Sequence, residues 1–482
     1  AVCDTGLDSG NADDIHPDFA GRVAWIKSYP ITDEFSSEIL NPRGDDGAAD
    51  LDSGHGTHVA GSVLGNGTGT KTVSGAPLIR GAAYKANLIF QAVEQAIEWK
   101  DSANYRRYGR YLLAGIPLDL AILFGDAYRK GARIHTNSWG GGAPGAYDAQ
   151  CEQLDRFVWG RKDFCILFAA GNDGSDSDGD GRINLMSVSS PGTAKNCITV
   201  GASENVRPQF ASETYGKWWP QDYPALPFRT DPMANKAHDI VASSSRGPTR
   251  DGRIKPDVIA PGTFILSTRS TRIAANNKGW AAYPPSKLYF HMGGTSMATP
   301  LAAGAVGLIR EYLRKQKRMQ APSAALLKAT LIAGAVRIGK DAKVGIADNH
   351  QGYGRVDLAA VLTPAKPLVA QFHDVHTGLR TGEVKRFSLK LKSAGALRVV
   401  LAYSDYPGPA LVNNLNLVAI SPRGQRYVGN QSESGTLMLD TRNNVEVVHI
   451  ARAAAGVWTL EVVASNIARG PQDFALVCIA PL

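Results

Sequence analysis

An α/β unit with a parallel sheet, followed by a small antiparallel β-sandwich or jelly roll, is the fold that the 482-residue sequence predicts. Up to about residue 362, short continuous apolar runs alternate with longer helical patterns, as expected when a parallel sheet is buried on both faces. Beyond the Pro-containing segment 363–367, apolar and polar residues alternate in short runs separated by turn residues. We therefore expect two domains, 1–362 and 368–482.

The expected parallel strands are the continuous apolar runs of the first unit. They are Asn87–Val93, Ile134–Ser138, Phe164–Ala170 and Ile198–Ala202. Helices are expected between them, for example over Leu118–Gly131. The segment Trp218–Lys236 is rich in aromatic residues and proline but has no periodicity, so it predicts a long surface loop.

The expected strands of the second unit are half-buried runs in which apolar and polar side chains alternate. They are Phe387–Lys392, Leu397–Tyr403, Asn416–Ile420, Val445–Ile450 and Trp458–Val463. Several short strands with turn residues between them are typical of a small sandwich or jelly roll.

The composition is that of a globular protein, with 44% hydrophobic and 20% charged residues. No apolar run of about 18 residues occurs, so we expect no helix to span a membrane, and no signal peptide is visible. The formal charge of +8 raises the question of a nucleic-acid partner. The densest basic run, Arg310–Arg318, lies on an expected amphipathic helix, and a solvated helix face explains it. We therefore expect no nucleic-acid partner.

The five cysteines are Cys3, Cys151, Cys165, Cys197 and Cys478. Their number is odd and their spacing matches no metal-binding knuckle. All but Cys151 lie in apolar, strand-like runs, where buried free thiols are common. A disulfide scaffold is excluded, whereas a single disulfide that includes Cys151 stays open.

Asp4 closes the apolar run Ala1–Cys3, which predicts a short buried strand. In open α/β sheets, functional sites form at the carboxyl ends of the strands. A carboxylate at this position also serves as a cap for a turn or helix, so Asp4 alone is a weak signal.

His55 lies between two glycines in the segment Asp52–Gly61, at the expected start of a helix. The glycines allow the backbone to pack closely against a neighbour, and a neutral imidazole at a helix start can accept a proton. His58 lies nearly one turn further on and points elsewhere, so we interpret it as structural.

Ser296 lies in the segment Gly293–Pro300, which leads into an apolar helix expected over Leu301–Leu313. At a helix N-terminus, free backbone N–H groups and the helix dipole favour developing negative charge. Plain N-capping also explains a serine here, but capping does not require the small residues that surround this one. We therefore favour a nucleophile.

Together these three segments resemble the subtilisin-like serine proteases, or subtilases. The matching motifs are Asp-Thr-Gly at Asp4, His-Gly-Thr-His-Val-Ala-Gly at His55 and Gly-Thr-Ser-Met-Ala-Thr-Pro at Ser296. The order Asp, His, Ser along the chain is also that of the family. The resemblance covers residues 1 to about 362 and implies a serine endopeptidase with a Ser-His-Asp triad and an acyl-enzyme.

The resemblance implies further site residues. Asn172 matches the side-chain donor to the oxyanion. Residues that match the family's substrate-binding segments are Ala114, Gly115, Ser138, Trp139, Gly140, Ala169, Ala170 and Gly171. Because small residues line the primary pocket, we expect broad specificity with a preference for apolar or aromatic side chains.

The loop that begins at Asp176 has carboxylates at positions 1, 3 and 5 and Gly181 at position 6, as in the first half of an EF-hand loop. The candidate ligands are Asp176, Asp178, Asp180, Arg182 and Asn184. Position 12 is Ser187 in place of the usual bidentate glutamate. A solvated acidic loop is the alternative, but carboxylates this close repel one another without a cation, so we expect structural Ca²⁺.

Within the family, the sequence most resembles alkaline, oxidation-tolerant bacterial subtilases with a C-terminal β-domain. This resemblance implies a secreted, monomeric protease that acts on proteins and peptides and does not associate with membranes. Only three residues precede Asp4, where the family has a longer stretch, so we expect a processed or partial chain.

The rival hypothesis for the function is a non-catalytic scaffold that has kept the fold. The β-domain is expected to stabilise the catalytic unit; binding to a polymer or cell surface is the alternative.

Overall fold

The first part of the chain is built around a seven-stranded sheet in the order β2-β3-β1-β6-β7-β8-β9, with every neighbouring pair parallel. The computed structural model describes residues 1–71, 73, 75, 77–339, 347–431 and 437–482. The strands are β1 Val2–Asp4, β2 Val23–Ser28, β3 Leu88–Ala92, β6 Ile134–Asn137, β7 Cys165–Ala169, β8 Ile198–Ser203 and β9 Val258–Pro261. The predicted α/β fold with a parallel sheet is therefore confirmed.

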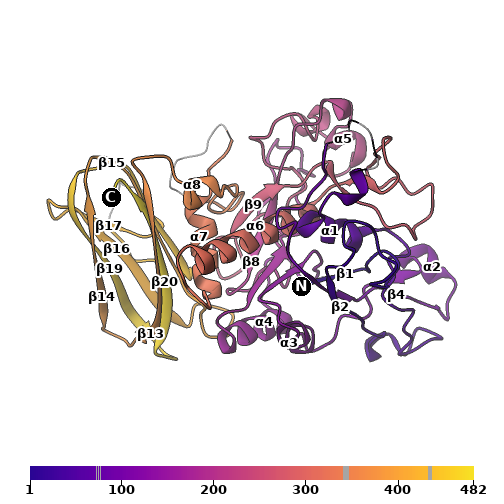
Figure 1. Ribbon diagram of the computed structural model, residues 1–482, viewed down its shortest axis with the longest axis horizontal. Helices are drawn as coiled ribbons and strands as arrows, with labels where there is room; N and C mark the ends of the chain where they lie inside the picture. The colour runs from indigo at the N-terminus through magenta and orange to yellow at the C-terminus, as the bar shows by residue number, and fades with distance from the viewer. Residues whose placement is uncertain (72, 74, 76, 340–346, 432–436) are drawn as a thin grey trace.

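Helices cover this sheet on both sides, and Figure 1 shows α3 and α4 below it and α1 and α6 above it. The main helices are α1 His55–Leu64, α3 Ala121–Arg129, α4 Ala149–Gly160, α6 Thr295–Lys315 and α7 Ala324–Gly334. The shorter elements are α2 Ala103–Tyr108, α5 Tyr215–Trp218, α8 Ala359–Leu362, β4 Gln95–Ala96, β5 Tyr111–Leu112, β10 Ile265–Thr268, β11 Ala281–Ala282 and β12 Tyr289–Met292.

The C-terminal part consists of two four-stranded antiparallel sheets, in the orders β13-β20-β15-β18 and β14-β19-β16-β17 (Figure 1, yellow). The strands are β13 Val369–Leu379, β14 Val384–Leu391, β15 Gly395–Ala402, β16 Asn413–Ile420, β17 Arg426–Val428, β18 Val445–Ala453, β19 Gly456–Ile467 and β20 Gln472–Ala480. A separate apolar core lies between the sheets, with Trp458 only 1% exposed. All five predicted strands are present, whereas β13, β17 and β20 were not predicted.

Helix α7 lies between the two parts and contacts both β7 and the strands β13, β15 and β20. Every residue of α7 is buried, as expected for a helix that is apolar on all sides. Its one charged residue, Lys328, forms an ion pair with Asp257 at 2.8 Å. The parallel sheet and the β-sandwich are thus packed against a shared helix.

Two local expectations need revision. The segment Trp218–Lys236 is not only loop, since α5 ends at Trp218 and a 3₁₀ turn covers Phe228–Thr230. All five cysteines are buried and unpaired, so the possible disulfide of Cys151 does not form. In the described part of the chain, no helix combines the length and apolar character needed to cross a bilayer.

Candidate active site

Asp4 and His55 meet where strand β1 ends and helix α1 begins. His55 Nδ1 donates to Asp4 Oδ1 at 2.6 Å, and the same oxygen accepts the backbone N–H of Thr5 at 2.8 Å. A Cβ on Gly56 would lie 2.3 Å from the carbonyl oxygen of Gly6, so only glycine lets α1 start this close to β1. The glycines beside His55 therefore bring the imidazole to a carboxylate that is only 2% exposed.

Asp50, which the sequence did not single out, fixes the start of α1. Its carboxylate accepts the backbone N–H and the hydroxyl of Thr57, at 2.8 and 2.6 Å, and the hydroxyl of Thr5 at 3.1 Å. Thr5 Oγ1 in turn accepts the N–H of Gly56 at 2.8 Å. These bonds satisfy first-turn N–H groups that a helix leaves unpaired. Burial raises the pKa of Asp50 to about 6, despite the hydrogen bonds to Thr57.

Ser296 is the second residue of α6 and is held against the end of β6. Its hydroxyl donates to the carbonyl of Ser138 at 3.1 Å, and the Ser138 hydroxyl donates to the carbonyl of Ser296 at 2.8 Å. Ser138 also lines a depression beside His55, so the two predicted segments share one site. Among the described residues, no hydrogen bond joins Ser296 Oγ to the His55 ring.

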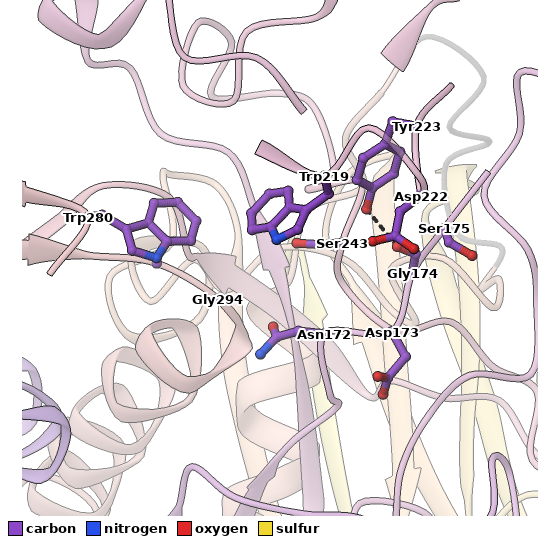
Figure 2. Close-up of a pocket in the computed structure, with 11 residues that line it drawn as sticks. Asn172, Asp173, Gly174, Ser175, Trp219, Asp222, Tyr223, Ser243, Trp280 and Gly294 are labelled. Atoms are coloured by element: carbon purple, nitrogen blue, oxygen red, sulfur yellow. Dashed lines mark hydrogen bonds between the residues drawn. The ribbon is translucent and has the colours of Figure 1, made fainter. Parts of the chain in front are cut away.

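Asn172 follows strand β7 and is anchored through its side-chain oxygen. Thr295 donates to Asn172 Oδ1 twice, from the backbone N–H at 2.8 Å and from the hydroxyl at 3.1 Å. Among the described residues, no hydrogen bond engages the amide Nδ2, so this end of the side chain remains available as a donor. A Cβ on Gly294 would lie 3.2 Å from Asn172 Nδ2, so a side chain at this position would crowd the amide that lines the pocket in Figure 2. Thr295 is the orienting residue that the motif alone did not identify.

Ser138, Trp139 and Gly140, which match a substrate-binding segment of the family, lie beside His55. All three line the depression next to His55, and Trp139 Nε1 donates to the carbonyl of Cys3 at 3.1 Å. Ala169 and Ala170 are buried at the end of β7. Gly171 has φ +105°, a backbone conformation that favours glycine.

Ala114 and Gly115, which match a substrate-binding segment of the family, have backbone groups that are bonded within the chain. The carbonyl of Ala114 accepts the N–H of Thr32 at 2.9 Å, and Gly115 donates its N–H to the carbonyl of Val93 at 2.9 Å. Both residues are buried, and neither lines the depression. The three residues before them, 111–113, line it instead.

The depression beside His55 has a volume of about 350 Å³. It is lined by Asp4, Thr5, Ser53, His55, Glu94, Tyr111, Leu112, Leu113, Ser138, Trp139 and Gly140. Glu94 lies two residues beyond the end of β3 and is half-buried. No sequence pattern indicates Glu94, because an isolated glutamate after an apolar strand is indistinguishable from a surface residue.

A second pocket, of about 390 Å³, is lined by Asn172 and the residues that follow it (Figure 2). Its aromatic wall includes Trp219 and Trp280, whose ring centroids are 6.1 Å apart. A Cβ on Gly293 would lie only 2.2 Å from the Trp280 ring, so glycine is required here. The aromatic segment that the sequence predicted as a surface loop therefore forms one wall of the site.

The charge of His55 is set by opposing effects. Burial disfavours the imidazolium, but the charge and hydrogen bond of Asp4, with smaller contributions from Asp50 and Glu94, raise the pKa of His55 above its ordinary value. His58, in contrast, is fully buried, donates to the carbonyl of Ile265 at 3.0 Å, and has its pKa lowered to about 3 by burial. These contacts agree with a structural role for His58.

The acidic loop brings its three aspartates together: one carboxylate oxygen from each of Asp176, Asp178 and Asp180 lies within 4.8 Å of the others. Asp176 is buried and accepts the N–H of Gly181 at 3.1 Å. Ser187, at the twelfth position, accepts the N–H of Arg246 and so faces a different partner. The other candidate ligands, Arg182 and Asn184, are exposed in the same loop.

Comparison with known proteins identifies one family. The profile described as "Subtilase family" matches residues 1–354. The Serine protease/ABC transporter B family protein tagA of Dictyostelium discoideum is 24% identical over 93% of this chain and 29% of its own length. The Serine protease AprX of Bacillus subtilis is 31% identical over 64% of this chain and 56% of its own. This chain thus spans less than two thirds of either relative.

Solved structures that this chain is similar to are more distant in sequence. The Patellamide maturation protease PatA is 18% identical, with a TM-score of 0.44 over 75% of this chain and 95% of its own. The Epidermin Leader Peptide Processing Serine Protease of Staphylococcus aureus is 18% identical, with a TM-score of 0.44 over 76% of this chain and 75% of its own.

Proposed function

The chain belongs to the subtilase family, and from this membership we propose that it is a serine endopeptidase that cleaves peptide bonds in proteins. Asp4, His55 and Ser296 form its catalytic triad. The observation that carries the proposal is the 2.6 Å bond from His55 Nδ1 to the buried carboxylate of Asp4. This bond fixes the tautomer that leaves Nε2 free as the general base.

The reaction follows from these positions. Ser296 Oγ leaves the Ser138 carbonyl, attacks the carbonyl carbon of the peptide bond and gives its proton to His55 Nε2. The oxyanion accepts hydrogen bonds from Asn172 Nδ2 and from the Ser296 backbone N–H. His55 then protonates the departing amine, which leaves an acyl-enzyme on Ser296. Water, deprotonated by His55, attacks the ester and releases the acid; Asp4 stabilises the imidazolium in both halves.

The substrate binds as an extended strand along Ser138–Gly140. The side chain of the residue whose carbonyl is attacked (P1) enters a pocket formed by Ala169, Ala170 and Gly171. The small side chains there support broad specificity with a preference for apolar or aromatic residues. Ala114 and Gly115 hold the preceding segment 111–113 in place at the depression, because their own backbone groups are bonded within the chain.

Structural Ca²⁺ binds the acidic loop. Calcium prefers carboxylate and carbonyl oxygens, and three carboxylates within 4.8 Å of one another fit that preference. Asp176, Asp178 and Asp180 are the ligands, and the backbone of Arg182 and the side chain of Asn184 complete the set. Neutralisation of three neighbouring negative charges stabilises the loop, which adjoins the pocket behind Asn172.

Chelation of Ca²⁺ is expected to destabilise the protein. A ligand that binds only the folded state contributes about 2.7 kcal/mol at a concentration 100 times its Kd, so EDTA is expected to lower the Tm. Asp178→Asn is expected to abolish this response, whereas Asp13→Asn, at an exposed aspartate elsewhere, retains it. Differential scanning calorimetry with and without EDTA measures the effect. An unchanged Tm, or a chelator response that persists in Asp178→Asn, contradicts the assignment.

The protein acts outside the cell as a monomer, with an alkaline optimum. The names of the Dictyostelium relatives combine a serine protease with an ABC transporter, and this chain corresponds to 29% of their length. The proposal therefore concerns only the protease part that this chain shares with these relatives.

Digestion of an unfolded protein substrate tests the proposed function. The chain is expected to cut reduced, alkylated casein at internal bonds, and Ser296→Ala is expected to remove this activity. Ser37→Ala, at an exposed serine, is the matched control and retains it. Casein left intact by the wild-type chain, or cut equally by Ser296→Ala, supports the non-catalytic scaffold instead.

A further inference from the structure

Glu94 is a half-buried carboxylate on the wall of the depression beside His55. Its backbone N–H donates to the carbonyl of Thr5 at 3.3 Å, which fixes the start of the side chain next to the Asp4 strand end. Among the described residues, no hydrogen bond or ion pair engages its carboxylate. Leu112, Leu113 and Gly140 also line this depression. Glu94 is therefore the acidic group of this depression that is not committed to another residue.

The electrostatic surroundings of Glu94 are strongly negative, although the chain as a whole carries a formal charge of +8. The charged groups that act on its carboxylate are Asp4, Asp50, Asp52 and His55. A further titratable group, Tyr111, also lines the depression. Burial, followed by the charges of Asp50, Asp52 and Asp4, raises the pKa of Glu94 to about 8. A cation in the depression lowers this repulsion, whereas a second anion increases it.

The proposed substrate path brings one particular side chain to Glu94, and this step rests on the proposed function. Side chains of an extended strand point alternately to opposite faces. If the P1 side chain enters the pocket at Ala169–Gly171, then the side chain of the preceding residue (P2) points the other way, toward His55 and Glu94.

We propose that Glu94 selects substrates with lysine or arginine at P2. The long aliphatic stem of such a side chain packs against Leu112 and Leu113, and its cationic end reaches the free carboxylate. The apolar preference at P1 is independent of this selection, because the two side chains enter different pockets. The favoured cleavage sequence is thus a basic residue followed by an apolar or aromatic one.

The selection is expected to depend on pH. Above about pH 8 Glu94 is ionised and binds the cation directly. Below that pH it is protonated, and the free energy needed to remove its proton weakens binding of the cation. The preference for a basic P2 residue therefore increases as pH rises through this range. Because two substrates are compared at each pH, titration of His55 affects both equally and cancels in the ratio.

Two peptides that are identical except for lysine or norleucine at P2 test the proposal through their ratio of kcat/KM. For the wild-type chain we expect a ratio of about 10 at pH 9.5 and about 2 at pH 6.5. Glu94→Gln is expected to give a ratio of about 1 at both pH values. Glu98→Gln, which removes the same charge from an exposed position nearby, keeps the wild-type ratios.

Each outcome is decisive. A wild-type ratio near 1 at pH 9.5 overturns the proposal without any variant. A preference for lysine that persists in Glu94→Gln also overturns it, because another group must then bind the cation. Cleavage of the norleucine peptide shows in the same experiment that the peptidase itself is active, so loss of selectivity is distinguishable from failure of the proposed function.

Discussion

His55→Ala is expected to lower kcat by about 10⁶-fold on a peptide substrate, a magnitude that comes from subtilisin, a member of the same family, and not from this structure. Without the imidazole, no group in contact with Asp4 can take the proton of Ser296. Steady-state kinetics with a chromogenic peptide measures the loss. His376→Ala, at an exposed histidine of the sandwich, is the matched control and retains wild-type kcat. A His55→Ala enzyme with more than a tenth of wild-type kcat contradicts the assignment.

The pH dependence provides a second readout of the same residue. Since Asp4 raises the pKa of His55 above its ordinary value, the imidazole is protonated and inactive as a base until pH exceeds that raised pKa. The rise of kcat/KM with pH is therefore expected above pH 6.5, the ordinary value for histidine. Asp4→Asn removes the charge that causes the shift, so the residual activity is expected to rise at lower pH. An unchanged midpoint argues against the pairing.

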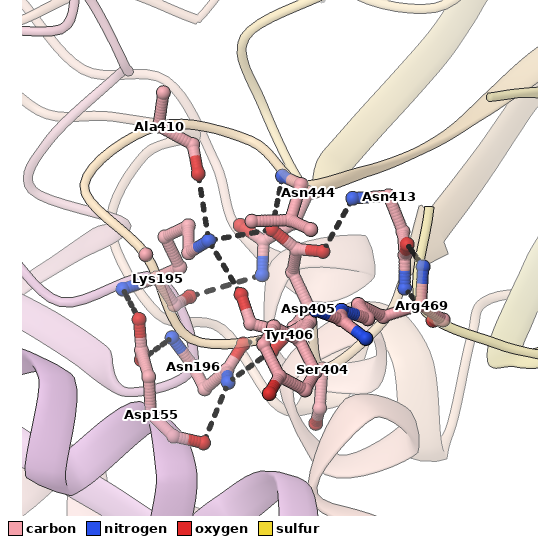
Figure 3. Close-up of polar contacts among 12 residues, drawn as sticks. Asp155, Lys195, Asn196, Ser404, Asp405, Tyr406, Ala410, Asn413, Asn444 and Arg469 are labelled. Atoms are coloured by element: carbon pink, nitrogen blue, oxygen red, sulfur yellow. Dashed lines mark hydrogen bonds and ion pairs between the residues drawn. The ribbon is translucent and has the colours of Figure 1, made fainter. Parts of the chain in front are cut away.

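Lys195→Met is expected to destabilise the folded chain by about 3–5 kcal/mol, because it leaves the carboxylate of Asp405 buried without a counter-charge. Both side chains are 0% exposed, and their ion pair is 2.6 Å long. Lys195 Nζ also donates to the carbonyls of Tyr406 and Ala410, both at 2.8 Å (Figure 3). The ammonium group is thus surrounded by the loop between β15 and β16, although Lys195 itself precedes β8.

Matched variants separate this effect from the loss of a surface charge. Lys217→Met breaks an exposed ion pair with Glu213 and is expected to cost less than about 1 kcal/mol. Lys195→Met combined with Asp405→Leu removes both buried charges and is expected to recover part of the stability. Urea unfolding monitored by tryptophan fluorescence measures all three. Equal midpoints for the two lysine variants contradict a structural role for this pair.

The same contacts bear on the role of the β-sandwich. Asn196 donates its side-chain N–H to the carbonyl of Asp405 at 2.8 Å. Its backbone N–H donates to the carboxylate of Asp155, in α4, at 2.8 Å. Asn444 of the sandwich donates to the carbonyl of Lys195 at 3.0 Å. We therefore favour stabilisation of the protease part over binding to a polymer. A chain that ends at Leu362 and keeps full thermal stability rejects this interpretation.

Motifs with a local cause could be predicted from the sequence. The strand end at Asp4 and the helix start at His55 are determined by neighbouring glycines and apolar runs, and both occur where expected. The predicted range Leu118–Gly131 contains α3, whose bounds are shorter because Asp119 caps its first turn and Gly131, at φ +98°, ends it. Strand β20 was missed because most of its residues are buried, so it lacks the alternation expected of a half-buried strand.

Residues that act through long-range contacts could not be predicted. Glu94, Asp50 and Trp280 reach the site from separate segments, and no short pattern around any of them indicates this. Ala114 and Gly115 were expected to pair with a substrate because they match one of the family's substrate-binding segments. In the fold, their neighbours Thr32 and Val93 use those backbone groups first.

The central claim, that Asp4 and His55 activate Ser296, is tested most directly by labelling with a fluorophosphonate and locating the label by mass spectrometry. We predict one label per chain, on the hydroxyl of Ser296, at a rate that rises with pH as His55 loses its proton. Labelling is predicted to be lost in Ser296→Ala and to slow by orders of magnitude in His55→Ala. A label on a different serine, or a rate on Ser296 that is unaffected by His55→Ala, would contradict the account.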